Sequence, residues 1–128
     1  MEQQVIEQLW RRALTPADAA ASWWAWKLQE GVKDEHTSPL DETALYVFES
    51  RLAAHLNAII AGSHEQAMRH GINILVDRDP DGILTKSAIE AGINITHFGA
   101  LVLTRMHVTP FRVSVCSYNG RPLTIWQN

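Results

Sequence analysis

Apolar residues recur every three or four positions in the first half of the chain, which is the spacing that gives a helix one apolar face. One run predicts a helix over about 2–14, and a longer run predicts the main helix over about 39–61. The residues in these two runs are Val5, Ile6, Leu9, Trp10, Ala13 and Leu14, and then Leu45, Phe48, Leu52, Leu56 and Ile59. The N-terminal half is therefore expected to be helical.

Short start signals place two further helices. A Thr-Pro pair at 15–16 puts a capping hydroxyl before a proline, whose missing N–H is not needed at the first position of a helix. It predicts a helix over about 16–30, which ends at the following glycine. A Ser-Pro pair at 38–39 starts the main helix in the same way. A serine after the main helix is a further cap and predicts a short helix over about 64–70.

The helix over 16–30 carries several tryptophans. At about 100° per residue, Trp23, Trp24 and Trp26 spread widely around the helix. A surface helix has a narrower apolar stripe, so either this helix is buried on two sides or one tryptophan faces out. In the first case the tryptophans belong to the core. In the second they form a partner-binding or oligomer surface, because Trp is enriched among the residues that dominate binding energy.

Runs of β-branched residues, separated by turn residues, follow in the second half. They predict strands over about 72–77, 99–108, 111–118 and 121–127, with one helix inserted over about 83–91. The expected fold class is α+β, in which the helical half, 1–70, packs on a mainly antiparallel sheet formed by the second half, 71–128. At 128 residues the chain is expected to be a single domain.

The tetrapeptide Gly-Ile-Asn-Ile occurs twice, at 71–74 and at 92–95. In both places a helix is expected to end on the glycine, which tolerates a left-handed backbone, and a strand is expected to begin. A strand–helix–strand order favours a parallel pair with a right-handed crossover. The repeat therefore predicts a local parallel pair on either side of the inserted helix.

Asn119-Gly120 is the strongest hairpin signal in the chain, because both residues accept a positive φ. A two-residue loop there pairs Tyr118 with Arg121, Cys116 with Leu123 and Val113 with Trp126. Pro122 has no N–H to donate to a neighbouring strand, so the last strand is expected at an edge of the sheet.

The formal net charge of −3 favours no particular partner. The charges are unevenly placed, because the chain has no acid after Glu90, whereas three arginines remain there. These arginines, Arg105, Arg112 and Arg121, either belong to a solvated sheet face or form an anion-binding or nucleic-acid-binding face. Because no exposed aromatic residues alternate with them, they fall short of a typical nucleic-acid footprint.

Cys116 is the single cysteine, so a disulfide within the chain is impossible and nothing indicates an oxidising compartment. The N-terminus has early acids and lacks the apolar core of a signal peptide. No run approaches the roughly 18 apolar residues of a membrane span. We therefore expect a cytoplasmic protein without membrane association.

An acidic turn is the clearest candidate for a metal site. Asp77, Asp79 and Asp81, followed by a glycine, match the first half of a calcium loop, in which oxygen ligands alternate before a sharp turn. The glutamate expected at the twelfth position of such a loop is replaced by Ala88. The same letters also fit a structural turn in which Asp81 caps the next helix. The alternatives are therefore a turn and a weak divalent-cation site.

Other catalytic signals are weak. The six histidines have no zinc-ligand spacing with cysteine, and no HExxH motif is present. Arg51 and His55 share one face of the main helix, as an exposed pair would. Cys116 fits a small core or face residue of a strand, and choosing His97 or His107 as its base is arbitrary. We therefore assign no catalytic residue.

Three hypotheses follow from these patterns. The first is a small cytoplasmic, non-enzymatic binding protein that docks on a protein partner and modulates or inhibits it, as inhibitors and immunity proteins of phages and mobile elements do. The second is a divalent-metal-dependent hydrolase or metal-binding module built on the acidic turn. The third is a nucleic-acid-binding protein. No cofactor other than a weakly bound divalent cation is expected, and a homodimer is compatible with each hypothesis.

Overall fold

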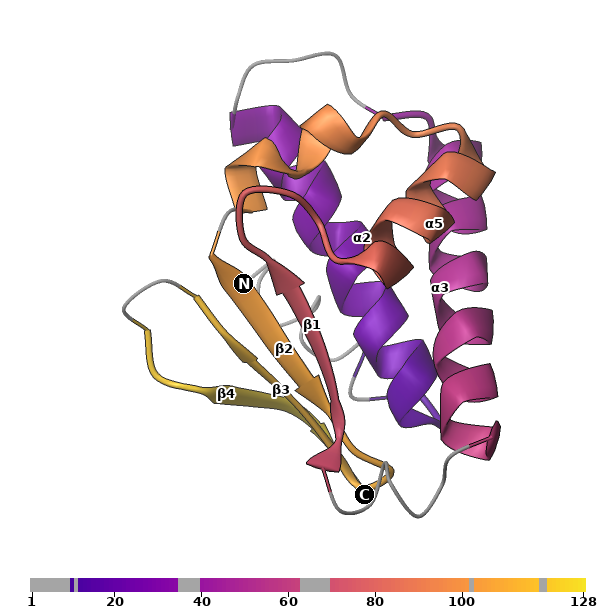
Figure 1. Ribbon diagram of the computed structural model, residues 1–128, viewed down its shortest axis with the longest axis vertical. Helices are drawn as coiled ribbons and strands as arrows, with labels where there is room; N and C mark the ends of the chain where they lie inside the picture. The colour runs from indigo at the N-terminus through magenta and orange to yellow at the C-terminus, as the bar shows by residue number, and fades with distance from the viewer. Residues whose placement is uncertain (1–9, 11, 35–39, 63–69, 102, 118–119) are drawn as a thin grey trace.

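An antiparallel sheet of four strands forms one layer of the protein, and the helices lie together on one of its faces (Figure 1). The computed structural model describes residues 10, 12–34, 40–62, 70–101, 103–117 and 120–128. The strands are β1 (Ile72–Val76), β2 (Thr104–Val108), β3 (Arg112–Cys116) and β4 (Leu123–Gln127), and they pair in chain order. The α+β fold with a mainly antiparallel sheet, predicted from the sequence, is confirmed.

The helices form the second layer. They are α2 (Pro16–Asp34), α3 (Glu42–Gly62), α5 (Gly82–Ala91) and the 3₁₀ helix η1 (Ile95–Leu101). Helix α2 packs against both the sheet and α3, and α5 packs along α3 (Figure 1). The alanines at 17, 19, 20 and 21 are all buried, although consecutive positions point to different sides of a helix. Helix α2 is therefore buried on two sides, while its Trp26 stays half-buried.

One hydrophobic core joins the helices to the sheet in a single domain. In β2 the side chains of Met106 and Val108 are buried and that of Arg105 is exposed, which is the alternation of a strand with one covered face. Trp24 of α2 is fully buried, and its indole N–H donates to Met106 Sδ at 3.2 Å. The central helix is thus held directly on the sheet.

Helix α2 begins as predicted and ends later than predicted. Thr15 Oγ1 accepts a hydrogen bond from Asp18 N–H at 3.1 Å, so the predicted cap is present. The helix then continues past the predicted end at residue 30 as far as Asp34, and Gly31 within it is buried. Packing around Gly31 outweighs its helix penalty of about 1 kcal/mol. No helix in the described part of the chain is long and apolar enough to cross a membrane.

Helix α3 begins at Glu42, later than the predicted start at 39. The Asp41 carboxylate accepts a hydrogen bond from Ala44 N–H at 3.3 Å, so an acid directly before Glu42 caps this helix. The predicted cap, the serine at 38, lies outside the described residues. The helix therefore begins later than predicted because Asp41, three residues after the predicted cap, is the residue that caps it.

The helix predicted over 2–14 is described only in part, and its predicted end is wrong. Residues 12–14 are not helical. The Ala13 carbonyl accepts a hydrogen bond from the indole N–H of Trp126 at 2.8 Å, so a contact with the sheet takes the place of a helical hydrogen bond. The helix predicted over 64–70 lies almost wholly outside the described residues.

The strand predicted over 99–108 is shorter and begins at Thr104. Residues 99–101 of the predicted strand belong to η1, in which Phe98 and Leu101 are buried three residues apart. Three residues is the period of a 3₁₀ helix, and a short apolar run does not distinguish it from a buried strand. The other strands and α5 agree with the predicted ranges to within two residues at either end.

The two Gly-Ile-Asn-Ile copies begin alike and then diverge. Gly71 and Gly92 both have the predicted left-handed backbone, with φ of 71° and 73°. Only the first copy continues as a strand. In the second, Asn94 Oδ1 accepts a hydrogen bond from Thr96 N–H at 3.0 Å, and this turn leads into η1. The predicted parallel pair is wrong, because every pairing among the described strands is antiparallel.

Strands β3 and β4 form the predicted hairpin with a shifted register. The predicted pair of Val113 and Trp126 is observed. Leu123, however, pairs with Val115 instead of with Cys116. A β-bulge between these pairs takes up one residue, so that two consecutive residues of β4 are buried. The predicted register assumed continuous pairing from a two-residue loop, and the bulge breaks that continuity.

The turn of this hairpin is closed by a hydrogen bond from Gly120 N–H to the Ser117 carbonyl at 2.8 Å. The predicted pair of residues 118 and 121 lies outside the described residues. Strand β4 is at the edge of the sheet, as the proline at 122 predicted. One side of β4 is therefore not paired with another described strand.

Candidate functional site

A pocket between α2 and the edge strand β4 is the strongest candidate for a binding site. Its volume is about 260 Å³. Three tryptophans, Trp10, Trp23 and Trp26, line it together with Lys27 and Arg121, and residues of β3 and β4 complete it on the side of the sheet. Aromatic rings and two cationic side chains thus meet in one concave site.

The tryptophans form the wall on the side of the helices. The ring centroids of Trp10 and Trp26 are 5.2 Å apart, and Trp23 meets Trp26 edge-on at 6.5 Å. Both distances are in the range of favourable aromatic pairs. Trp23 and Trp26 are three residues apart on α2 and therefore share one face of the helix. This spacing brings both rings to the pocket, while Trp24 points into the core.

Lys27 and Arg121 are the positively charged residues among the described residues that line the pocket. The Lys27 ammonium lies 5.6 Å from the centroid of the Trp26 ring, which is close enough for cation–π attraction. Arg121 is exposed on the segment that leads into β4. The described residues that line the pocket include no Asp or Glu. The pocket therefore favours a ligand that combines an apolar part with a negative charge.

Two tryptophans at the pocket have indole N–H groups that find no hydrogen-bond partner among the described residues. Nε1 of Trp10 and Nε1 of Trp26 are closed to solvent, and within the described part of the chain neither finds an acceptor. A buried donor without a hydrogen bond costs about 1–3 kcal/mol. By contrast, Nε1 of Trp24 donates to a methionine sulfur and Nε1 of Trp126 to a backbone carbonyl. Unused hydrogen-bonding capacity therefore lies beside the pocket.

The structure separates the three tryptophans that were predicted as a partner surface. Trp24 is fully buried and cannot touch a partner in this fold. Trp23 is 6% exposed and Trp26 is half-buried, and both line the pocket. Partner binding at these two residues stays a prediction. Trp10 joins them from a distant segment, which helical spacing alone did not indicate.

The three arginines predicted to bind anions do not form one cluster. Arg105 and Arg112 lie on the sheet face turned away from the helices, because the residues that follow them point into the core. Arg105 pairs with Cys116, which is four residues, or roughly 13 Å, along β3 from Arg112. Arg121 lies at the pocket instead. A continuous basic face over the three residues is therefore not formed.

The acidic turn is a structural element. The Asp81 carboxylate accepts hydrogen bonds from the backbone N–H groups of Gly82, at 2.9 Å, and Leu75, at 3.3 Å. It caps α5 and ties that helix to β1, as the alternative to a metal site predicted. Within the described residues, which include Asp77 and Asp79, no three His, Cys, Asp or Glu side chains are arranged to hold a metal ion. The divalent-cation hypothesis gains no support from this geometry.

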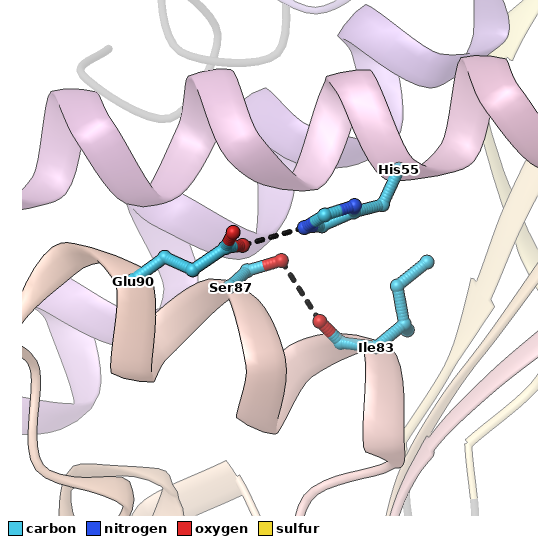
Figure 2. Close-up of polar contacts among 4 residues, drawn as sticks. All are labelled: His55, Ile83, Ser87 and Glu90. Carbon is cyan, nitrogen blue, oxygen red and sulfur yellow. Dashed lines mark hydrogen bonds and ion pairs between the residues drawn. The ribbon is translucent and has the colours of Figure 1, made fainter.

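A polar contact joins α3 to α5 (Figure 2). His55 Nε2 lies 2.5 Å from Glu90 Oε1, and the two side chains are partly exposed. The sequence places His55 beside Arg51 but does not reveal Glu90 as its partner, because the two residues are 35 positions apart. The contact with His55 lowers the pKa of Glu90 against the opposing effect of desolvation, and the charges of Arg51 and Lys86 add to the lowering.

Ser87 lies beside this pair without taking part in it. Its side chain is fully buried, and its hydroxyl donates to the Ile83 carbonyl at 2.8 Å, within the same helix (Figure 2). A serine nucleophile would need its hydroxyl directed at a base. The contact of His55 with Glu90 is therefore a link between two helices and not part of a nucleophile–base pair.

Cys116 and His107 lie on the outer face of the sheet, in diagonal positions of the β2–β3 pair. The Cys116 thiol donates to the Gly120 carbonyl at 3.1 Å. His107 Nδ1 lies 3.0 Å from Asn73 Oδ1. Each side chain has a partner of its own in the fold, which is the situation expected for Cys116 as a face residue of a strand.

The chain matches no protein-family model, and no curated protein is significantly similar to it. The pocket between α2 and β4 is the feature that combines concave shape, aromatic side chains and charge.

Proposed function

We propose that this protein is a small, non-enzymatic binding protein that docks on a protein partner through the pocket between α2 and β4. The proposal is supported by the meeting of Trp23, Trp26 and Arg121 in one concave site. Trp and Arg are enriched among the residues that dominate protein–protein binding energy, and they contribute most in well-packed pockets. The pocket supplies both residue types together.

The size of the pocket favours a side chain of a protein over a whole cofactor. Pockets for drug-sized ligands typically measure about 300–1,000 Å³ and enclose most of the ligand. At about 260 Å³, this pocket lies below that range. It has room for one large side chain of the partner. The rest of the partner would contact the surface around the pocket. Leu123 adds apolar surface at the rim, where it is 53% exposed.

The role that we infer is to modulate or inhibit the partner in the cytoplasm. A small domain that covers a functional surface of another protein needs an anchor and a rigid scaffold and no catalytic group. Inhibitors and immunity proteins, including those of phages and mobile elements, are domains of this kind. The inference rests on this analogy of size and composition together with the pocket.

A photo-crosslinking side chain placed at position 123 tests the docking proposal. The variant is made by replacing Leu123, tagged, illuminated in lysate of the source cell, and analysed by mass spectrometry. The matched control carries the same side chain at Ile89 of α5, which is 68% exposed and lies away from the pocket. We expect one dominant protein adduct from position 123 and none from position 89.

Nuclease treatment separates a protein partner from a nucleic-acid bridge. The adduct is expected to form unchanged in nuclease-treated lysate. Equal adducts from both positions, or an adduct that nuclease abolishes, would contradict docking of a protein at the pocket.

Neither alternative function has an observation of its own in its favour. The aspartates of the acidic turn do not come together as a cation site, and Asp81 is used as a helix cap. The basic residues Arg105 and Arg112 are separated on the outer face of the sheet. The metal-dependent hydrolase and the nucleic-acid-binding protein therefore remain hypotheses from the sequence alone.

A further inference from the structure

We infer that the occupant of the pocket is a segment of the partner protein that carries an aromatic side chain next to carboxylate groups. The inference rests on the proposed docking function and specifies the chemistry of what docks. Three features of the pocket carry it: the aromatic wall, the placement of the two cations, and two indole N–H groups that have no acceptor among the described residues.

The aromatic wall indicates the anchor. Trp10, Trp23 and Trp26 already pair with one another at centroid distances of 5.2 and 6.5 Å. A further ring that enters the pocket extends this set, since aromatic rings gain from offset and edge-to-face arrangements beyond the burial of their area. A pocket of about 260 Å³ also has room for one aromatic side chain.

The cations indicate what lies beside the anchor. Lys27 belongs to α2, whereas Arg121 belongs to the segment before β4, so each of the two elements that bound the pocket contributes one positive charge. The chain has no acid after Glu90, and the described lining residues include none. Carboxylates on either side of the anchor would therefore meet a cation on each wall, while lysines there would be repelled.

The indole N–H groups of Trp10 and Trp26 strengthen the choice of an oxygen-rich ligand. Neither has an acceptor within the described part of the chain, and both are closed to solvent. A carboxylate or a backbone carbonyl of the entering segment would supply the missing acceptor once the rings reorient on binding. Binding is then expected to move these two N–H resonances in particular.

A nucleic acid is the less favoured occupant. A base could stack on the tryptophans. Stable binding of a phosphate backbone, however, draws on many cations, commonly about six to ten. The described lining residues supply two, Lys27 and Arg121. A short oligonucleotide is therefore included in the test as a competing ligand.

The test uses three capped peptides that differ in one property each. The first is acetyl-Glu-Glu-Phe-Glu-Glu-amide, the second replaces every Glu with Lys, and the third replaces Phe with Ala. Each is titrated to millimolar concentration into the full-length, ¹⁵N-labelled protein, and the indole N–H resonances are followed. We expect the first peptide to bind at least tenfold more tightly than either of the others.

The tryptophans provide internal controls. Resonances of Trp10, Trp23 and Trp26 are expected to shift with the first peptide. Those of Trp24 and Trp126, whose N–H groups are engaged inside the fold, are expected to stay in place. Uniform shifts of all five resonances would overturn the inference, because they would indicate a change of the whole fold instead of binding at the pocket.

A charge reversal tests the role of the cations. Arg121→Glu should lower the affinity for the first peptide about three- to tenfold, because the variant replaces an attraction at an exposed site by a repulsion. Arg112→Glu makes the same change on the outer face of the sheet and should leave affinity unchanged. Equal effects of the two reversals would overturn the inference, since they would show only a response to net charge.

Failure of the inference and failure of the docking proposal give different results. If the three peptides bind equally, or if a single-stranded oligonucleotide of thymidines binds more tightly than the first peptide, the ligand class is wrong. Crosslinking from position 123 can still capture a protein in that case. If the first peptide binds selectively but crosslinking captures no protein, the ligand chemistry stands and the docking function is wrong.

Discussion

Asp81 shows how a single carboxylate supports two neighbouring elements. It accepts hydrogen bonds from the N–H groups of Gly82 in α5 and of Leu75 in β1. We expect Asp81→Ala to lower the free energy of unfolding by about 0.5–2 kcal/mol, because the cap of α5 is lost. Urea denaturation followed by circular dichroism measures this difference.

Asp79 provides the matched control for that measurement. It lies in the same turn, and its exposed side chain forms no hydrogen bond with any described residue. Asp79→Ala should change the free energy of unfolding by no more than about 0.5 kcal/mol. Equal losses in the two variants would show that the charge of the turn, and not the cap, stabilises this region.

Glu90 makes the stability of the fold depend on pH. The folded state holds the pKa of Glu90 below its ordinary value of 4.5, chiefly through the contact with His55. A lowered pKa means that the ionised carboxylate favours the folded state. This contribution is complete above pH 4.5 and is lost as the pH falls through the folded pKa, where the carboxylate takes up a proton.

We therefore expect Glu90→Gln to be less stable than the natural protein at pH 6 and to approach it in stability at pH 3. Urea denaturation at a series of pH values measures the difference. A difference between Glu90→Gln and the natural protein that stays constant from pH 6 to pH 3 would rule out the contact as its source.

At the scale of elements, η1 is a part of the core. Its Phe98 is 1% exposed and lies 6.0 Å from Phe48 of α3, measured between ring centroids. We expect Phe98→Ala to lower the free energy of unfolding by about 3–5 kcal/mol, because it removes a large buried side chain and leaves a cavity. Thermal or urea denaturation measures the loss.

Phe111, in the turn between β2 and β3, is the control for this substitution. Its side chain is 52% exposed, so Phe111→Ala should change the free energy of unfolding by about 0.5 kcal/mol or less. Similar losses in both variants would indicate that η1 does not close the core as described. If Phe98→Ala fails to fold, Phe98→Leu, with a smaller loss of volume, gives the same comparison.

At the scale of the whole molecule, one core predicts one unfolding transition. The buried cluster takes residues from α2, α3, α5, η1 and all four strands. Circular dichroism in the far ultraviolet reports mainly on the helices, whereas tryptophan fluorescence also reports on β4 through Trp126. We expect the two signals to give the same urea midpoint, as two-state unfolding requires. Separate midpoints would mean that the helical layer and the sheet unfold independently.

Local features could be predicted from the sequence because nearby residues decide them. The Thr15 cap depends on a backbone N–H three residues away, and the Asp81 cap on the next residue. The left-handed backbones at Gly71 and Gly92 likewise follow from the residue type and the end of a helix. Runs of β-branched residues between turn residues placed most strands to within two residues. These features require no knowledge of distant contacts.

The predictions that failed depended on distant contacts. The early end of the first helix involves a hydrogen bond from Trp126 to Ala13, and the shifted hairpin register involves a bulge that buries two residues in a row. Helix α2 runs through Gly31 because packing outweighs its intrinsic preference. In each case tertiary packing overrode a correct local tendency.

The sequence by itself determined the class of the fold, the order of most of its elements, the caps of α2 and α5, and an acid-free C-terminal third. Only the tertiary structure decided that Trp24 is wholly inside the core, whereas Trp10, Trp23 and Trp26 line a pocket at its border. Trp10, Trp26 and Arg121 come from three separate segments of the chain. His55 and Glu90 likewise come from two different helices. Periodicity reports which face of an element is apolar, but it does not report which faces meet. That is set by packing across the whole chain, and the candidate site exists only as a result of it.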